Sequence, residues 1–81
     1  MIAFVRGNFV QKMPAKVVVD VNGIGYDLQI SLNTYSVIAN KESGQLFTYL
    51  HITENAQTLY GFADLNEKEL FLNLISVPSD R

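Results

Sequence analysis

The feature that most constrains the fold is a strict alternation of apolar and polar residues on both sides of an Asn-Gly pair. Residues 15–21 read AKVVVDV and residues 24–32 read IGYDLQISL. A two-residue period is typical of a β-strand with one buried face. Asn22-Gly23 is a strong hairpin signal, because both residues tolerate the positive φ that tight hairpin turns require. The pattern therefore predicts an antiparallel hairpin, with Ala15, Val17, Val19 and Val21 on one face of the first strand and Ile24, Tyr26, Leu28, Ile30 and Leu32 on one face of the second.

Three further strands are predicted from the same alternation. Residues 2–13 form a long strand that Pro14 ends, and Gly7 within it suggests a bend or bulge at a barrel corner. Residues 46–52 (LFTYLHI) and 58–63 (TLYGFA) form the other two. We expect a short helical turn or an irregular connector at residues 33–39 and a loop at residues 40–45.

A helix is predicted to follow the last strand. Asp64 is a suitable N-cap, and Glu67 stands three residues later, at capping-box spacing. The helix is expected over residues 65–75, ahead of Pro78. Five alternating strands without strand-helix-strand units argue against a parallel sheet. We expect an all-β domain with a short C-terminal helix, namely a five-stranded OB-fold Greek-key barrel, with an SH3-like barrel as the alternative.

Length and composition limit the function classes. The chain has 81 residues, of which 48% are hydrophobic and 17% charged, as expected for one globular domain. It has no cysteine and no run approaching the ~18 apolar residues of a membrane span, so we expect a cytoplasmic protein. A net charge of −2 argues against a broad basic surface for nucleic acids.

Nothing in the sequence indicates an enzyme. His51 is the only histidine, which excludes a site built from several histidines, and the glycines are not followed by a phosphate-loop Lys-Ser/Thr. The serines lack a recognisable base, and no paired carboxylates stand out. We therefore expect no catalytic residues, no metal and no cofactor.

Aromatic residues are concentrated on the predicted strands. Nucleic-acid-binding OB barrels stack bases on such side chains, but no basic residues are interleaved with them here, so core packing is the favoured interpretation. A single-strand nucleic-acid binder that stacks bases on Tyr49 and Tyr60 remains an alternative. The aromatic residues on the predicted strands are Tyr26, Phe47, Tyr49, Tyr60 and Phe62.

Two features are not explained by a barrel core. Glu54 stands on a short polar tip between the last two strands. The final helix is apolar on nearly every side: Leu70 with Leu74, and Phe71 with Ile75, can form one inward stripe at i, i+4 spacing. Two further apolar residues are then left as candidate contacts with a partner or a further domain, namely Leu72 and Val77.

Four segments, taken together, resemble the N-terminal domain of the RuvA family over residues 1–77. They are MIAFVRG, VVVDVNGIGYDLQIS, ENAQTLYGFAD and ELFLNLISV. The resemblance implies an OB-fold barrel over residues 1–63, a closing helix over 64–77 that leads toward a second domain, and a tail over 78–81. It also implies a homotetramer that holds four-way (Holliday) junction DNA open for the RuvB motor, which binds a later C-terminal domain.

The resemblance also assigns the hairpin tip as an acidic pin near the centre of the junction. The family commonly has Arg-Glu-Asp-Ala there, whereas this chain has Thr53-Glu54-Asn55-Ala56. Glu54 matches the first acidic position, and Asn55 matches the second by position only. Each pin would therefore carry one carboxylate instead of two.

The end of the sequence departs from the family as well. The family continues into a glycine-rich helix-hairpin-helix segment, whereas this chain reads Pro78-Ser79-Asp80-Arg81. We expect the later domains, which supply most phosphate contacts, to be missing, and junction binding by this chain to be weak. The sequence predicts a non-catalytic DNA-binding scaffold, and the alternative is a stand-alone adaptor that grips a protein through Leu72 and Val77.

Overall fold

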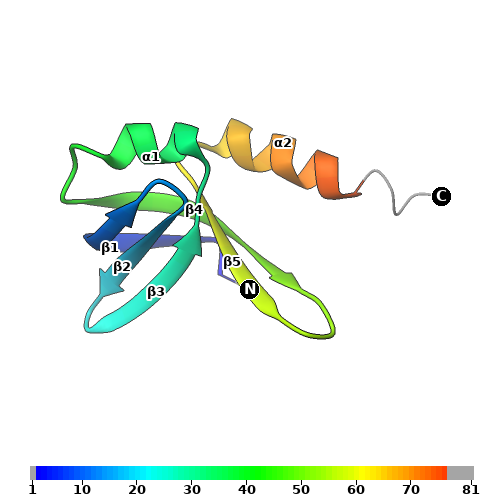
Figure 1. The fold of residues 1–81 in the computed structure, drawn as a ribbon, viewed down its shortest axis with the longest axis horizontal. Helices are drawn as coiled ribbons and strands as arrows, with labels where there is room; N and C mark the ends of the chain where they lie inside the picture. The colour runs from blue at the N-terminus through cyan, green and yellow to red at the C-terminus, as the bar shows by residue number, and fades with distance from the viewer. Residues whose placement is uncertain (1, 77–81) are drawn as a thin grey trace.

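Five strands close into a barrel, with one helix before β4 and a second helix after β5 (Figure 1). The computed structural model describes residues 2–76. The strands follow the order β1-β2-β3-β5-β4, and all neighbours are antiparallel except β3 and β5. The chain is thus an OB-fold barrel with a short C-terminal helix, as predicted. The elements are β1 (Phe4–Met13), β2 (Lys16–Val21), β3 (Ile24–Gln29), α1 (Leu32–Ile38), β4 (Ser43–Ile52), β5 (Gln57–Phe62) and α2 (Leu65–Ser76).

The predicted Asn-Gly hairpin joins β2 to β3. Asn22 has φ 54° and Gly23 has φ 92°, so both occupy the left-handed region that such a turn requires. The Gly23 N–H donates to Asp20 Oδ1 at 2.8 Å, which closes the turn. This local chemistry fixes the strand register, in which Val21 faces Ile24.

The barrel interior is filled by one apolar cluster. Val17, Val19 and Leu28 are fully buried, as the alternation predicts. They pack with residues from β1, β4 and α1, so the short helix closes one end of the barrel. The remaining members of the cluster are Val5, Phe9, Ile38 and Leu46.

Two local predictions are wrong. The register shift in β1 lies between Phe9 and Gln11, not at Gly7. A Cβ on Gly7 would lie 2.3 Å from the Asp20 carbonyl oxygen, so glycine is needed there because β1 and β2 approach closely. Further along, β3 ends at Gln29 and Leu32 is 70% exposed, because Ser31 caps α1 by accepting from the Thr34 N–H at 3.1 Å.

The second half of the chain matches the predicted elements with shifted boundaries. β4 begins at Ser43, three residues earlier than expected, and β5 begins at Gln57. The polar tip between them lies where it was predicted. Asp64 caps α2, because its Oδ1 accepts from the Glu67 N–H at 2.8 Å.

Candidate functional site: a hairpin arm with an acidic tip

The β4–β5 hairpin projects from the barrel as an arm, defined here as residues 49–59 (Figure 1). The pairing of β4 with β1 ends at Phe47 opposite Phe4, and the Thr48 N–H adds one bond to the Ala3 carbonyl at 2.9 Å. On the other side, β5 pairs with β3 at Tyr60 opposite Gln29. Beyond these points the two strands continue together, away from the barrel core.

The tip of the arm is closed by Thr53. Its backbone N–H donates to the Ala56 carbonyl at 2.8 Å, and its hydroxyl accepts from the Ala56 N–H at 3.1 Å. A threonine side chain thus replaces one backbone bond of the turn. Glu54 and Asn55 are held between these two residues, and both are exposed. Among residues 2–76, neither side chain bonds to another side chain.

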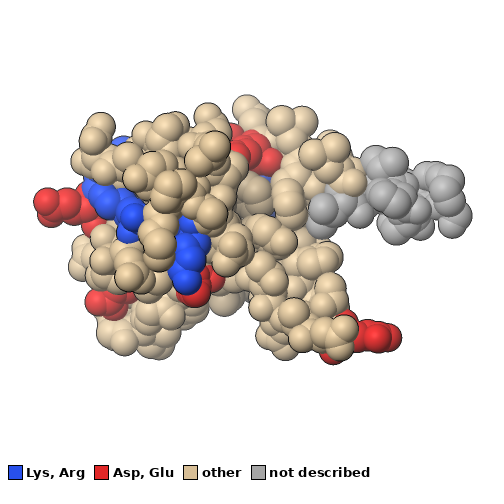
Figure 2. Space-filling model, in the orientation of Figure 1, with Lys and Arg blue, Asp and Glu red and all other residues tan. Residues whose placement is uncertain are grey.

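Glu54 is the only acidic residue of the arm, which contains no lysine or arginine. In Figure 2 the acidic atoms at the far end of the arm stand apart from the lysines and arginines, which gather over the barrel. Within residues 49–59, no lysine or arginine screens the Glu54 carboxylate. The arm presents one isolated negative charge at its most distant point.

The base of the arm is held by an aromatic cluster on the outer face of β4 and β5. The Tyr60 and Phe71 ring centroids are 4.8 Å apart, and Phe62 lies 5.3 Å from Phe71. Tyr49 lies 6.1 Å from both Phe71 and His51. The predicted core role of these rings is therefore only partly right: Phe62 is buried, but the rings pack between the sheet and α2 instead of inside the barrel.

This packing also bears on base stacking. Tyr49 and Tyr60 are half-buried, and Phe71 of α2 occupies part of their surroundings. His51 lies 6.4 Å from Tyr60 and belongs to the same cluster. Tyr49 and Tyr60 pack against Phe71 of α2, so they are less accessible as free stacking platforms.

A polar network ties α2 to α1. Glu67 accepts from the Thr34 hydroxyl at 2.7 Å and from the Ser31 hydroxyl, and the Thr34 hydroxyl accepts from the Ala63 N–H at 3.0 Å. The predicted capping box is thus only half correct, because the Glu67 side chain reaches α1 instead of its own N-cap residue. Thr34 is fully buried, so the network is part of the fold.

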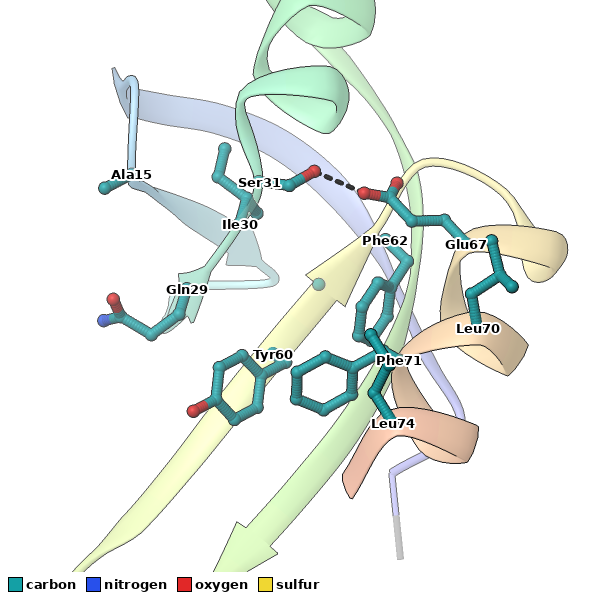
Figure 3. Close-up of a pocket in the computed structure, with 11 residues that line it drawn as sticks. Ala15, Gln29, Ile30, Ser31, Tyr60, Phe62, Glu67, Leu70, Phe71 and Leu74 are labelled. Atoms are coloured by element: carbon teal, nitrogen blue, oxygen red, sulfur yellow. Dashed lines mark hydrogen bonds between the residues drawn. The ribbon is translucent and has the colours of Figure 1, made fainter. Parts of the chain in front are cut away.

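An open groove of about 460 Å³ runs beside α2 (Figure 3). The predicted inward stripe of α2 is partly wrong, because Leu70 is 64% exposed and Leu74 is 74% exposed, and both line this groove. Leu72 is half-buried, and Val77 lies outside the described residues. Among the described apolar side chains of α2, Leu70 and Leu74 are the most exposed. The groove is completed by Gln29 at the end of β3, by Ile30 directly after it and by Tyr60 of β5.

Comparison with known proteins places this geometry in a family. The model of the RuvA N terminal domain matches residues 1–61. The chain belongs to the RuvA N-terminal domain family. Curated relatives carry the name Holliday junction branch migration complex subunit RuvA. The Amoebophilus asiaticus protein is 53% identical over 78 residues, which are 95% of this chain and 40% of that protein.

Other RuvA relatives match to the same extent. The Cytophaga hutchinsonii protein is 52% identical over 77 residues, 95% of this chain and 39% of that protein. The Bacteroides fragilis protein is 53% identical over 77 residues, 95% of this chain and 38% of that protein. This RuvA-type chain therefore spans about two fifths of the length of these relatives.

Within residues 2–76, no three His, Cys, Asp or Glu side chains gather closely enough to hold a metal ion. No helix in the same range is long and apolar enough to cross a membrane. The chemically distinctive features are the solitary Glu54, the aromatic cluster under α2 and the groove with its exposed leucines.

Proposed function

We propose that this chain is the core module of a scaffold that holds four-way junction DNA during branch migration. The observation that carries the proposal is the solitary Glu54 at the end of a projecting arm, in a chain that belongs to the RuvA N-terminal domain family. In this proposal the chain acts in the cytoplasm, assembles as a homotetramer and has no catalytic activity. A RuvB-type motor supplies the ATP-driven step through a part of the longer protein.

Four-fold symmetry would give the tip its role. One carboxylate per arm places four negative charges around the point where the DNA strands cross. Carboxylates and phosphates repel, and the repulsion grows where little water or salt screens them. Such a centre weakens binding at the crossover and keeps the DNA from settling in one position, so Glu54 acts as the pin and Asn55 as its uncharged neighbour.

Most of the affinity for DNA would come from elsewhere. The chain has six Lys and Arg against eight Asp and Glu, and the arm has neither Lys nor Arg. Affinity for duplex DNA depends chiefly on cations that neutralise phosphates. We therefore propose that this module positions the junction, while parts present in the longer relatives supply most phosphate contacts.

The helix fits a role at a domain boundary. We propose that residues 1–63 form the barrel module and that residues 64–77 lead toward a second domain. Leu70 and Leu74 support this proposal, because two leucines exposed side by side on one helix are typical of a surface that another element covers. Leu72 of the same helix remains a candidate contact, as does Val77, which lies outside the described residues.

Binding of labelled DNA to the 81-residue chain tests the proposal. We expect weak binding at physiological salt, with a preference for a four-way junction over a linear duplex of the same arm sequence. Glu54→Gln should raise junction affinity by about two- to five-fold, because it removes a charge that repels phosphate. Glu42→Gln, at an exposed carboxylate outside the arm, is the matched control and should change affinity less.

Two outcomes would contradict the proposal. Tight, junction-selective binding by the chain at physiological salt would mean that phosphate contacts reside in this module after all. Equal affinity for junction and duplex at low salt would favour the second candidate, an adaptor that binds a protein segment. The open groove beside Leu70 and Leu74 is the observation that supports that candidate.

A further inference from the structure

The arm has backbone edges that no strand covers. On the β4 side, pairing with β1 stops at Phe47, apart from the single bond from Thr48 to Ala3. On the β5 side, pairing with β3 is limited to Tyr60 opposite Gln29, and the two strands diverge from there (Figure 1). Within residues 2–76, the distal parts of β4 and β5 therefore pair only with each other.

The groups that face outward can be identified from the register. Outward and inward backbone groups alternate along each strand of an antiparallel pair. Since the Thr48 N–H points outward to Ala3, the backbones of Leu50 and Ile52 face the same side. Leu59 and Gln57 stand opposite Leu50 and Ile52, so their backbone groups face outward on the β5 side.

Neither edge is protected in the usual ways. Exposed edges are normally blunted by lysine, proline or a bulge. The arm contains no lysine and no proline, and its register runs without a shift from Tyr49 opposite Tyr60 to Ile52 opposite Gln57. Ile52, next to the tip, is 63% exposed. An unprotected strand edge of this kind is suited to pairing with another strand.

We propose that the β4 edge of one copy pairs with the β5 edge of the next copy, so that the arms join edge to edge around the symmetry axis. This inference rests on the proposed homotetramer and names the surface that forms it. Because β4 and β5 run in opposite directions, like-oriented copies would pair their arms antiparallel. Two copies joined in this way still have one unpaired β4 edge and one unpaired β5 edge. Further copies therefore add to these edges until a ring closes.

The arm itself provides the argument for a second copy as the occupant. A strand from a different protein would cover one edge and leave the other exposed. The same chain offers both complementary edges on one element, and a ring of arms covers all of them. It also places every Glu54 at the same end of the ring, where the proposed pin requires it.

Solution mass against concentration tests the inference. The monomer is 9.1 kDa, so a tetramer is 4 × 9.1, about 36 kDa. We expect the chain to associate toward that mass. Ile52→Pro removes an outward N–H without touching an inward bond, and it should lower the association constant about ten-fold or more. Val10→Lys, at a similarly exposed apolar residue on β1, is the control and should associate like the original chain.

A second variant and a second measurement keep the test decisive. Ile52→Lys places a charge on the strand edge and so disfavours edge pairing. This variant tests the contact even if Ile52→Pro does not fold. Hydrogen exchange at the Leu50 and Ile52 amides should slow as protein concentration rises. If the chain forms a tetramer that the Ile52 variants leave intact, the edge contact is wrong while the proposed assembly survives. If the chain stays monomeric at high concentration, the edge contact is overturned, and junction preference still tests the proposed function separately.

Discussion

Thr53 shows how one side chain can shape the candidate site. Its hydroxyl takes the place of a backbone acceptor for the Ala56 N–H, so the turn closes around Glu54 and Asn55. In the resemblance to the family, Thr53 marks only the loss of a basic residue, since the family commonly has Arg at this position. The structure gives it a positive role, because a threonine hydroxyl at the first position of a turn is a known way to stabilise it.

Replacing Thr53 by valine should therefore loosen the tip. The change keeps the branched shape but removes the bond to the Ala56 N–H, and we expect a loss of about 0.5–1 kcal/mol in the free energy of unfolding. Thr58→Val is the matched control on the same arm, because the Thr58 hydroxyl makes no hydrogen bond within residues 2–76. Urea denaturation followed by circular dichroism measures both variants. Equal stabilities would mean that the Thr53 hydroxyl bonds no better than water does.

At single residues, the sequence predicts best where a local rule also decides the outcome. Asn22-Gly23 sets its own turn, and the alternation correctly assigns Val17 and Leu28 to the core. The alternation fails at Leu32, because it continues past the end of β3. Ser31 starts a helix there by capping the Thr34 N–H, and a cap of this kind overrides a strand pattern that has no partner strand.

At the level of elements, the sequence predicts each strand and both ends of α2 but not how α2 is held. The spacing of Asp64 and Glu67 correctly indicates a helix start. The partner of the Glu67 side chain is Thr34 of α1, a residue far away in the sequence. Similarly, the spacing of Leu70 and Leu74 indicates one stripe but not which side of the helix the sheet covers. Both outcomes depend on tertiary packing, which periodicity alone does not determine.

Removing the Glu67 carboxylate should weaken the link between α1 and α2. In Glu67→Ala, the buried Thr34 hydroxyl and the Ser31 hydroxyl lose their shared acceptor, so we expect a loss of about 1–3 kcal/mol in the free energy of unfolding. Glu69→Ala, at an exposed residue of the same helix, should stay within about 0.5 kcal/mol of the original chain. Chemical denaturation compares the two variants. If Glu67→Ala and Glu69→Ala lower the free energy of unfolding equally, the network contributes no more to stability than an ordinary surface carboxylate does.

At the scale of the whole molecule, the position of Glu54 sets it apart from the other charged residues. Figure 2 shows lysines, arginines and acidic residues together over the barrel, whereas the acidic atoms at the end of the arm, where Glu54 is the only acidic residue, stand apart. In an assembly that brings the arms together, this arrangement concentrates negative charge at the centre and leaves attraction for DNA to more peripheral surfaces. In the proposed function, the role of the tip is therefore a property of the assembly and not of one chain of 81 residues.

Reversing the charge of the tip tests this arrangement most directly in a full-length protein that carries this domain. Glu54→Lys changes each tip by two charges and a tetramer by eight, so the centre would attract phosphate instead of repelling it. We expect junction binding to tighten about ten-fold and branch migration to slow, because the DNA would be held at one position. Glu42→Lys adds the same charge outside the arm and separates the effect of position from that of net charge. If junction affinity and migration rate respond alike to Glu54→Lys and Glu42→Lys, Glu54 is an ordinary surface carboxylate.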